Sequence, residues 1–355
     1  MSFRSMVNRL KVYFPGVEPD RVGIELYEAL REPPVPPPSD VWGKRFAPIF
    51  GDADRYFCRV DANDADVAVY PYRFDGSPVS VAAMDDARRH GLPFIATSWG
   101  DDYAAIDLPY GSLFRQSILR SRRSEREFAI PAYCVDSLEG VPVERYIRTK
   151  GAKPLAGFCG YCGTGWLRLM YRLTGRRRKV DGLSLRVELL RRLQTSPRID
   201  AIVVPQTKFL GGAKGAISDD PDHARRVRKQ FLDNVLNTGY TLCVRGAGNF
   251  SYRFYEVLAA GRIPIFVDTD CVLPFEEIIP WRKHCVWVPL ADMDRIADIV
   301  ADFHASLSEK QFMDLQAANR ALWQEYLHPT AFWRHALTLA RDARRAPVAG
   351  TDRPR

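Results

Sequence analysis

The segment from residue 240 to residue 267 constrains the fold more than any other part of the chain. Residues 240–244 are apolar and predict a buried strand, and a loop with two glycines, RGAGNF, follows them. Residues 252–260 have helical spacing, and Gly261 ends that pattern before a second apolar run at residues 263–267. The order predicts a β-loop-α-β unit, which belongs in a parallel sheet.

The junction of loop and helix in such a unit suits an anionic ligand. The free N–H groups and the positive end of the helix dipole favour a phosphate there. Arg245 and Arg253 flank the junction, and a guanidinium group can make paired hydrogen bonds to a diphosphate. Gly246 and Gly248 would let the backbone approach it, and Ser251 would cap the helix or bind phosphate.

Arg253 and Glu256 lie three residues apart and share one face of the predicted helix. A cation near the helix start and a carboxylate one turn later fit a nucleotide-sugar, since the carboxylate would accept hydrogen bonds from ribose or sugar hydroxyls. The alternative is an exposed ion pair with no ligand role, which is what most charged helix pairs are. The glycine spacing alone decides little, because Ser251 stands where the dinucleotide fingerprint has its third glycine.

The N-terminal half predicts a second α/β domain. Residues 67–70 and 94–97 are short apolar runs bounded by Asp, Gly and Pro, as buried parallel strands are. Residues 79–90 between them are helix-like and end at Gly91. Residues 137–153, rich in Gly, Pro and charge, predict a linker between the two domains.

Several of these segments carry a family resemblance. Residues 242–281, with LCVRGAGNFSYRFYEVLAAGRIPIFVD and CVLPFEEIIPW, resemble the exostosin-type domain of glycosyltransferase family 47. The upstream pieces DADVAVYPY, SWGDD, LFRQSI, AIPAYCVD and KPLAGFCGY are similar to bacterial members, so the likeness spans roughly residues 55–290.

The resemblance implies an α/β fold of GT-B type, with two facing Rossmann-like domains, parallel sheets and a cleft between them. Residues 1–145 would form the acceptor-side domain, and residues 150–320 the exostosin-like domain that binds the nucleotide-sugar. A helix over residues 321–345 would cross back to the first domain. The donor-binding residues expected on this basis are Arg245, Gly246, Gly248, Asn249, Ser251, Arg253 and Glu256.

The implied activity is an inverting transfer of a sugar from a nucleotide-sugar donor to a glycan or lipid-linked oligosaccharide acceptor, in bacterial cell-surface polysaccharide biosynthesis. Two other classes stay open, because a fold supports several functions. One is a non-catalytic glycan- or nucleotide-binding partner of a transferase. The other is a different GT-B enzyme, such as a nucleotide-sugar epimerase or a phosphorylase.

An inverting transfer needs a base near the acceptor hydroxyl. Asp101 and Asp102 follow the predicted strand at residues 94–97, and such a position lies at the cleft end of an open parallel sheet. The alternative is that one of them caps a helix. Arg115, in LFRQS, would contact phosphate or acceptor, or else make a structural ion pair.

Asp268-Thr-Asp270 has the spacing with which some glycosyltransferases hold a divalent cation. In the exostosin-type pattern the same segment is a loop on the donor side, so we expect no metal ion and no cofactor. The six His residues show no metal-binding spacing, and Cys159 and Cys162 form a single CxxC that packing explains better than zinc.

The net charge of +8 comes partly from basic runs at residues 121–126, 175–179, 186–192 and 224–230. No nucleic-acid module accompanies these runs, so we expect them to contact an anionic membrane surface. The alternative is that they are solvent-exposed surfaces with no binding role. The sequence has no apolar run long enough to span a membrane and no secretory leader pattern, which leads to a cytoplasmic expectation.

Overall fold

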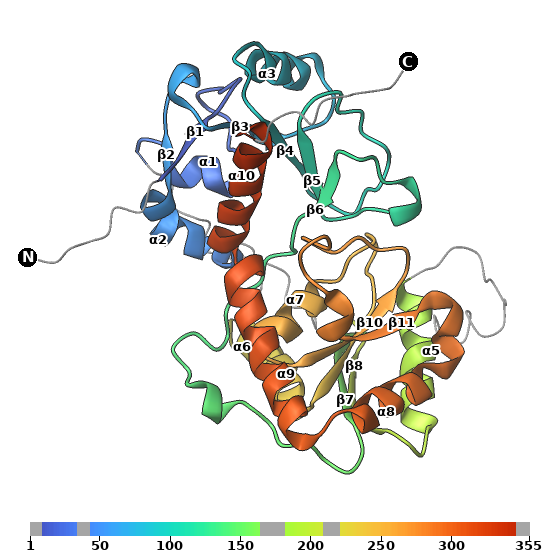
Figure 1. The fold of residues 1–355 in the computed structure, drawn as a ribbon. Helices are drawn as coiled ribbons and strands as arrows, with labels where there is room; N and C mark the ends of the chain where they lie inside the picture. The colour runs from blue at the N-terminus through green and yellow to red at the C-terminus, as the bar shows by residue number, and fades with distance from the viewer. Residues whose placement is uncertain (1–8, 34–42, 164–181, 209–220, 346–355) are drawn as a thin grey trace, which may run out of the picture.

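Short apolar segments form the strands of two separate parallel sheets, one in each half of the chain (Figure 1). The computed structural model describes residues 9–33, 43–163, 182–208 and 221–345. Both sheets have helices on their faces, so the expected α/β fold with two Rossmann-like domains is confirmed.

The first sheet has the strand order β2-β1-β3-β4-β5-β6, with every neighbouring pair parallel. Residues 67–72 of β3 are all buried, as in a strand covered on both faces. Its strands are β1 (Leu10–Tyr13), β2 (Phe57–Arg59), β3 (Val67–Arg73), β4 (Phe94–Ser98), β5 (Ser112–Arg115) and β6 (Glu127–Ala129). Its helices are α1 (Glu25–Ala29), η1 (Gly43–Arg45), α2 (Ala47–Tyr56), η2 (Ala62–Asp64), α3 (Pro78–Arg89) and η3 (Arg120–Arg122).

The second sheet has the order β11-β10-β9-β7-β8, again all parallel. Its strands are β7 (Leu155–Tyr161), β8 (Asp200–Gln206), β9 (Tyr240–Cys243), β10 (Ile263–Asp268) and β11 (Val286–Pro289). Its helices are α5 (Gly182–Thr195), α6 (Pro221–Asn237), α7 (Tyr252–Ala259), η7 (Trp281–Lys283), η8 (Leu290–Arg295) and α8 (Ile296–Ser306). The first strand in the chain, β7, lies beside the third, β9, and the second lies outside them. The strand order therefore reverses between β7 and β9, where doubly wound sheets bind ligands.

The predicted β-loop-α-β unit is β9, α7 and β10, and Gly261 follows α7 with a φ of +60°. Strands β3 and β4 and helix α3 also coincide with predicted elements. The short strands β1, β2, β5, β6 and β11 had no clear period in the sequence.

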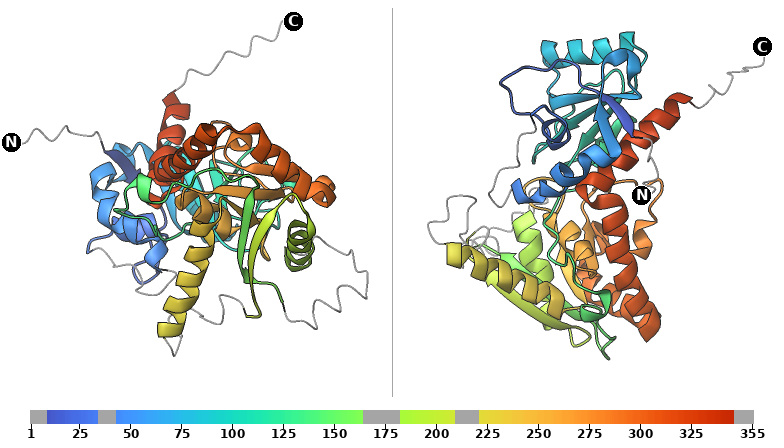
Figure 2. Two further views of the ribbon diagram at one scale, coloured as in Figure 1. Left: turned by 90° about the horizontal axis from the view of Figure 1, so that it is seen from below. Right: turned by 90° about the vertical axis from the view of Figure 1, so that its left-hand side faces the viewer.

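The C-terminal segment joins the two domains. Helix α9 (Glu309–Leu322) packs on α7 and β10, a short π-helical turn η9 (Trp323–Leu327) follows, and α10 (Pro329–Arg345) packs on α2, β3 and β4 (Figure 2). The segment is not one continuous helix. His328 is extended because a residue before proline avoids the helical region, and Pro329 then starts a new helix.

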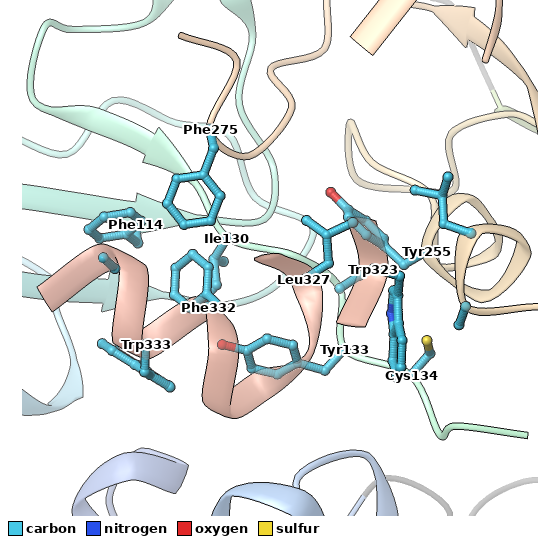
Figure 3. Packing of buried hydrophobic residues seen from close by; sticks show 14 of the residues in the cluster. Phe114, Ile130, Tyr133, Cys134, Tyr255, Phe275, Trp323, Leu327, Phe332 and Trp333 are labelled. Carbon is cyan, nitrogen blue, oxygen red and sulfur yellow. The ribbon is translucent and has the colours of Figure 1, made fainter. Parts of the chain in front are cut away.

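A single hydrophobic cluster crosses from one domain to the other through this segment (Figure 3). The ring of Phe332, on α10, lies 5.4 Å from that of Phe114, on β5, and 5.5 Å from that of Phe275, in the loop after β10. The relative placement of the two sheets therefore depends on shared packing as well as on the linker.

Glu25, at the start of α1, is a buried carboxyl group that should make stability depend on pH. It accepts a hydrogen bond from Trp333 Nε1 at 2.8 Å, and burial raises its pKa from 4.5 to about 7. A raised carboxyl pKa contributes stability that is complete below pH 4.5 and is lost as the pH rises through about 7.

Glu25→Gln keeps the acceptor and removes the charge. We expect the wild type to lose on the order of 2–3 kcal/mol more unfolding free energy than the variant between about pH 5 and about pH 8. Urea unfolding at several pH values measures this difference. Parallel pH dependence in both proteins would show that the Glu25 carboxyl is not the responsible group.

Candidate functional site

The carboxyl ends of the two sheets face each other and are joined by hydrogen bonds. Asp101, in the loop after β4, accepts the backbone N–H of Gly248, in the loop after β9, at 3.0 Å. Ser117, after β5, accepts the N–H of Asn249 at 2.8 Å. Ligands of open α/β sheets bind at this end, so the candidate site lies where these loops meet.

Arg253 lies at the reversal point of the second sheet. Its Nη2 donates to the carbonyl oxygen of Cys159 at 2.8 Å, and its guanidinium carbon lies 4.0 Å from the ring centre of Phe158. Arg253 is on α7 and both of its partners are on β7, so the side chain reaches from the helix to the end of that strand. Burial lowers the pKa of Arg253, and its Nε makes no hydrogen bond in the described part of the chain. A partly buried cation with a free donor favours an anionic partner.

Two further arginines lie at the same strand ends. Arg245 follows β9, donates through Nη2 to Ala247 O at 2.9 Å and lies 5.7 Å from the ring of Tyr103, in the loop after β4. Arg186, on α5, donates to the carbonyl oxygens of Tyr161 at 2.6 Å and of Arg245 at 3.4 Å. Sequence reasoning missed Arg186 as a site residue, because it begins a basic run typical of a surface.

Glu256 forms an ion pair with an arginine from another helix. It accepts from Arg228 Nη1, on α6, at 2.7 Å, while Arg253 turns away towards β7. Arg228 also donates to Ser137 Oγ at 3.0 Å. The alternative considered from the sequence, an exposed ion pair between Arg253 and Glu256, is therefore wrong, because Arg228, distant in sequence, pairs with the carboxylate.

The loop before α7 contains five of the expected donor-binding residues, which are Arg245, Gly246, Gly248, Asn249 and Ser251. Ser251 is the N-cap of α7, yet its side chain makes no capping hydrogen bond. Gly246 is exposed, and a Cβ placed on it would meet nothing within 4 Å. A Cβ on Gly248 would lie 2.8 Å from Asp101 Cα, so this glycine is required by the facing loop.

The buried side chain of Asn249 holds the same loop in place through hydrogen bonds. It is 1% exposed, and its Nδ2 donates to the carbonyl oxygens of Ile118 at 2.8 Å and Asp270 at 3.0 Å. Its Oδ1 accepts from Thr269 Oγ1 at 2.8 Å. With its amide fully used, Asn249 positions the loop across the domain boundary.

Asp101 and Asp102 are both exposed, and the segment 102–111 contains no helix for either to cap. Asp101 meets the Gly248 N–H through Oδ1, which places it against the arginine-bearing loop. Asp102 Oδ1 accepts the N–H of Ala104 at 2.8 Å, a local turn of the kind aspartate commonly makes. Only Asp101 is thus held in direct contact with the second domain through its carboxylate.

Arg115 makes the structural ion pair that the sequence left open. Its Nη1 lies 2.7 Å from Glu127 Oε1, and the two side chains are 4% and 7% exposed. Its Nη2 donates to the carbonyl oxygen of Asp102 at 3.0 Å. Arg115 therefore positions the loop of Asp101 and Asp102 through a hydrogen bond to its backbone.

The carboxylates of Asp268 and Asp270 both accept hydrogen bonds from backbone N–H groups. Asp268 Oδ1 accepts the N–H groups of Asp270 at 3.0 Å and Cys271 at 3.1 Å, and Asp270 accepts the N–H of Ser121 at 3.1 Å. Within the described ranges, no three His, Cys, Asp or Glu side chains are grouped as metal ligands would be. The triplet shapes the loop after β10 and contacts the first domain.

A cavity of about 280 Å³ lies beside Asp101, between the domains. Sequence reasoning missed it, because its aromatic rings come from four separate segments with no shared period. Its lining residues are Arg45, Phe46, Trp99, Gly100, Gln116, Tyr133 and Tyr252.

Many arginines of the basic runs have carboxylate partners. Arg123 pairs with Glu276 and Glu277 across the domain boundary, and Arg192 pairs with Glu188. The run at residues 175–179 lies outside the described residues. Every helix in the described ranges is too short or too polar to cross a membrane.

Residues 144–303 match the family model of the Exostosin GT47 domain. This part of the chain is therefore similar to an exostosin-type domain. This domain contains the whole second sheet and the arginines at its reversal point, so the resemblance based on residues 242–281 is confirmed.

The curated relatives share only part of their length with this chain. Exostosin-1 of Drosophila melanogaster is 30% identical over 107 residues, which are 30% of this chain and 14% of that protein. Probable glucuronosyltransferase 47 A of Physcomitrium patens is 31% identical over 128 residues, 34% of this chain and 28% of that protein. Exostosin-2 of Homo sapiens is 31% identical over 88 residues, 24% and 12% respectively.

Two solved structures are similar at low sequence identity. TarM has a TM-score of 0.35 and 8% identity, over 78% of this chain and 55% of that one. The GtfA/B complex bound to UDP and GlcNAc has a TM-score of 0.28 and 10% identity, over 84% and 60%.

Proposed function

We propose that this chain is an inverting glycosyltransferase that moves a sugar from a nucleotide-sugar to a glycan acceptor. One observation carries the proposal: Arg186 and Arg253 both lie against Phe158 at the reversal point, Arg245 follows the neighbouring strand β9, and the Asp101 carboxylate contacts the loop of Arg245. Clustered arginines suit a diphosphate, and a carboxylate across the cleft suits an acceptor hydroxyl.

In the donor half, Arg245 and Arg253 bind the diphosphate together with the free N–H groups at the start of α7. Ser251 Oγ, which makes no capping bond, donates to a phosphate oxygen. Glu256, with one carboxylate oxygen held by Arg228, accepts from a ribose or sugar hydroxyl.

In the reaction, Asp101 takes the proton of the acceptor hydroxyl as that oxygen forms its bond to the anomeric carbon. The bond from the anomeric carbon to the diphosphate breaks, and its electron pair leaves with the diphosphate. Arg245 and Arg253 stabilise the added charge on the leaving group. A single displacement of this kind inverts the configuration of the anomeric carbon.

Arginines replace a metal ion in this proposal, and no cofactor takes part. Asp268 and Asp270 are engaged with backbone N–H groups of their own loop and of η3, which supports a structural role for them. A transfer rate unchanged by EDTA is expected, and a rate restored only by Mg²⁺ or Mn²⁺ would contradict this part of the proposal.

The acceptor is a glycan or lipid-linked oligosaccharide of bacterial cell-surface polysaccharide synthesis, and the enzyme acts in the cytoplasm against the inner membrane surface. The net charge of +8 supports a weak, salt-sensitive contact with anionic lipid. Sedimentation with vesicles of anionic and of neutral lipid tests this contact. Equal binding to both, or binding that does not weaken with salt, would contradict it, and we expect no binding of nucleic acid.

A thermal-shift screen against nucleoside diphosphates and nucleotide-sugars, with and without EDTA, tests the donor site. A ligand at about 100 times its Kd stabilises a folded protein by about 2.7 kcal/mol, which is readily measured. One nucleotide family should shift the wild type, and product analysis should then show transfer to an added glycan. Stabilisation without any transfer would favour a non-catalytic nucleotide-binding partner, and no shift with any nucleotide would contradict the donor site.

A further inference from the structure

Three aromatic rings of the first domain form a continuous apolar wall in the cavity beside Asp101. Trp99 lies 5.6 Å from Tyr133 and 6.1 Å from Phe46, and Phe46 lies 5.9 Å from Tyr133, between ring centres. The hydroxyl of Tyr133 points towards α10, so the cavity meets the body of this ring (Figure 3). The faces of such rings carry negative charge density and attract polarised C–H groups.

The cavity also contains a polar group that nothing in the described chain satisfies. Gln116, after β5, is 6% exposed and lines the cavity, and its side-chain amide makes no hydrogen bond within the described ranges. A nearly buried amide offers two donors and an acceptor and strongly favours a polar partner. Aromatic faces together with one free amide fit a ligand that is apolar on its faces and polar at its rim.

The second domain adds one ring. Tyr252, the first residue of α7, lies against the guanidinium carbon of Arg45 at 4.3 Å from its ring centre. The next residue, Arg253, turns to the other side of the same helix turn, towards β7. The cavity and the arginine cluster therefore lie on two sides of the start of α7.

We propose that this cavity is a subsite for one saccharide ring of the acceptor, stacked against Trp99 and Tyr252 and bound at its rim by the Gln116 amide. A pyranose has C–H groups on its faces and hydroxyls around its edge, which matches these walls. The volume of about 280 Å³ is at the low end of small-molecule pockets, roughly 300–1,000 Å³, and suits a single ring. Gly100, which lines the cavity, precedes Asp101 in the chain, and the proposal directs one hydroxyl of the bound ring towards that carboxylate.

The inference rests on the proposed transferase function in assigning the ring to the acceptor. Six of the seven lining residues belong to the first domain, whereas the candidate diphosphate arginines belong to the second. A nucleobase is the other flat ligand with polar edges that these aromatic walls would accept. Nucleosides thus serve as the competing occupant in the test.

Saturation-transfer NMR on the whole protein tests the subsite, with methyl glycosides of hexoses, N-acetylhexosamines and uronic acids as probes. Irradiation of the aromatic protons should label the C–H protons on one face of a bound ring. Trp99→Leu and Gln116→Leu should each weaken binding roughly tenfold, the effect of one aromatic contact or one satisfied amide. Trp99→Phe should restore part of the affinity, and Trp287→Leu, on β11, is the matched control that should bind normally.

Circular dichroism and unfolding midpoints identify variants that fail to fold. If Trp99→Leu does not fold, the affinity of Trp99→Phe is compared with that of the wild type instead. Absence of labelling with every glycoside, while nucleoside diphosphates bind, would overturn the subsite and leave the transferase proposal standing. Labelling of nucleosides that Trp99→Leu abolishes would overturn it in favour of a nucleobase site. Glycoside labelling in a protein that binds no nucleotide would keep the subsite and contradict the transferase function.

Discussion

Arg253→Ala should lower the transfer rate by about a hundred- to a thousandfold, the usual effect of removing one group that stabilises charge in the transition state. The reason is its position: Arg253 is a partly buried cation at the reversal point of the second sheet, with an Nε that no described group accepts. Binding of nucleoside diphosphate should weaken as well, because the leaving group carries the charge that Arg253 meets. Steady-state kinetics and diphosphate titration together measure both effects.

The control for Arg253→Ala must separate charge from packing, since the guanidinium stacks on Phe158. Arg253→Met keeps an apolar stem against that ring and should lose transfer as completely as the alanine variant. Arg198→Ala removes an exposed arginine that pairs with Asp298 and Asp302, and it should leave transfer unchanged. Normal diphosphate affinity in folded Arg253→Met would remove the central residue of the donor site.

The sequence predicted the donor side well because its signals are local. A strand, a glycine loop and an amphipathic helix follow one another within residues 240–267, and each has its own period or breaker. Local patterns did not predict the contacts that a residue makes with a distant part of the chain. Arg228, on α6, pairs with the Glu256 carboxylate, so the ion pair of Glu256 with Arg253 that spacing offered as an alternative does not form, and no local pattern marks the pairing with Arg228.

The two glycines of the loop have different roles, one towards a ligand and one towards the first domain. Gly246 is open to solvent, so a ligand can approach its backbone, whereas Gly248 is pressed against Asp101 of the other domain. Asn249 then fixes the loop to the carbonyl oxygens of Ile118 and Asp270. Sequence patterns identified the loop but not its contact with the first domain, because that contact depends on how the two sheets face each other.

The aromatic cavity is the part of the site least accessible to sequence reasoning. Phe46, Trp99 and Tyr133 come from three separate segments of the first domain and Tyr252 from the start of α7, and they meet only because both sheets present their carboxyl ends to one cleft. SWGDD was identified as a shared loop for its aspartates. The structure shows that its tryptophan and glycine line the cavity, directly before Asp101 in the chain.

Asp101→Asn should lower the transfer rate by about a hundred- to ten-thousandfold, the range for loss of a general base. The amide oxygen of asparagine can still accept the Gly248 N–H, so the contact between the domains is kept and only the ability to take a proton is lost. Binding of nucleoside diphosphate should therefore be unchanged, and kcat rather than donor KM should fall. Single-turnover kinetics with a saturating nucleotide-sugar measures this split.

Asp102→Asn is the matched control, because the two aspartates are adjacent and both exposed. Asparagine at this position can still accept the N–H of Ala104, so the turn is kept and transfer should be close to that of the wild type. The opposite order, with Asp102→Asn inactive and Asp101→Asn active, would move the base by one residue and leave Asp101 as a link between the domains. Equal activity of both variants would mean that the acceptor proton goes to a different group, and the inverting displacement through this loop would then be wrong.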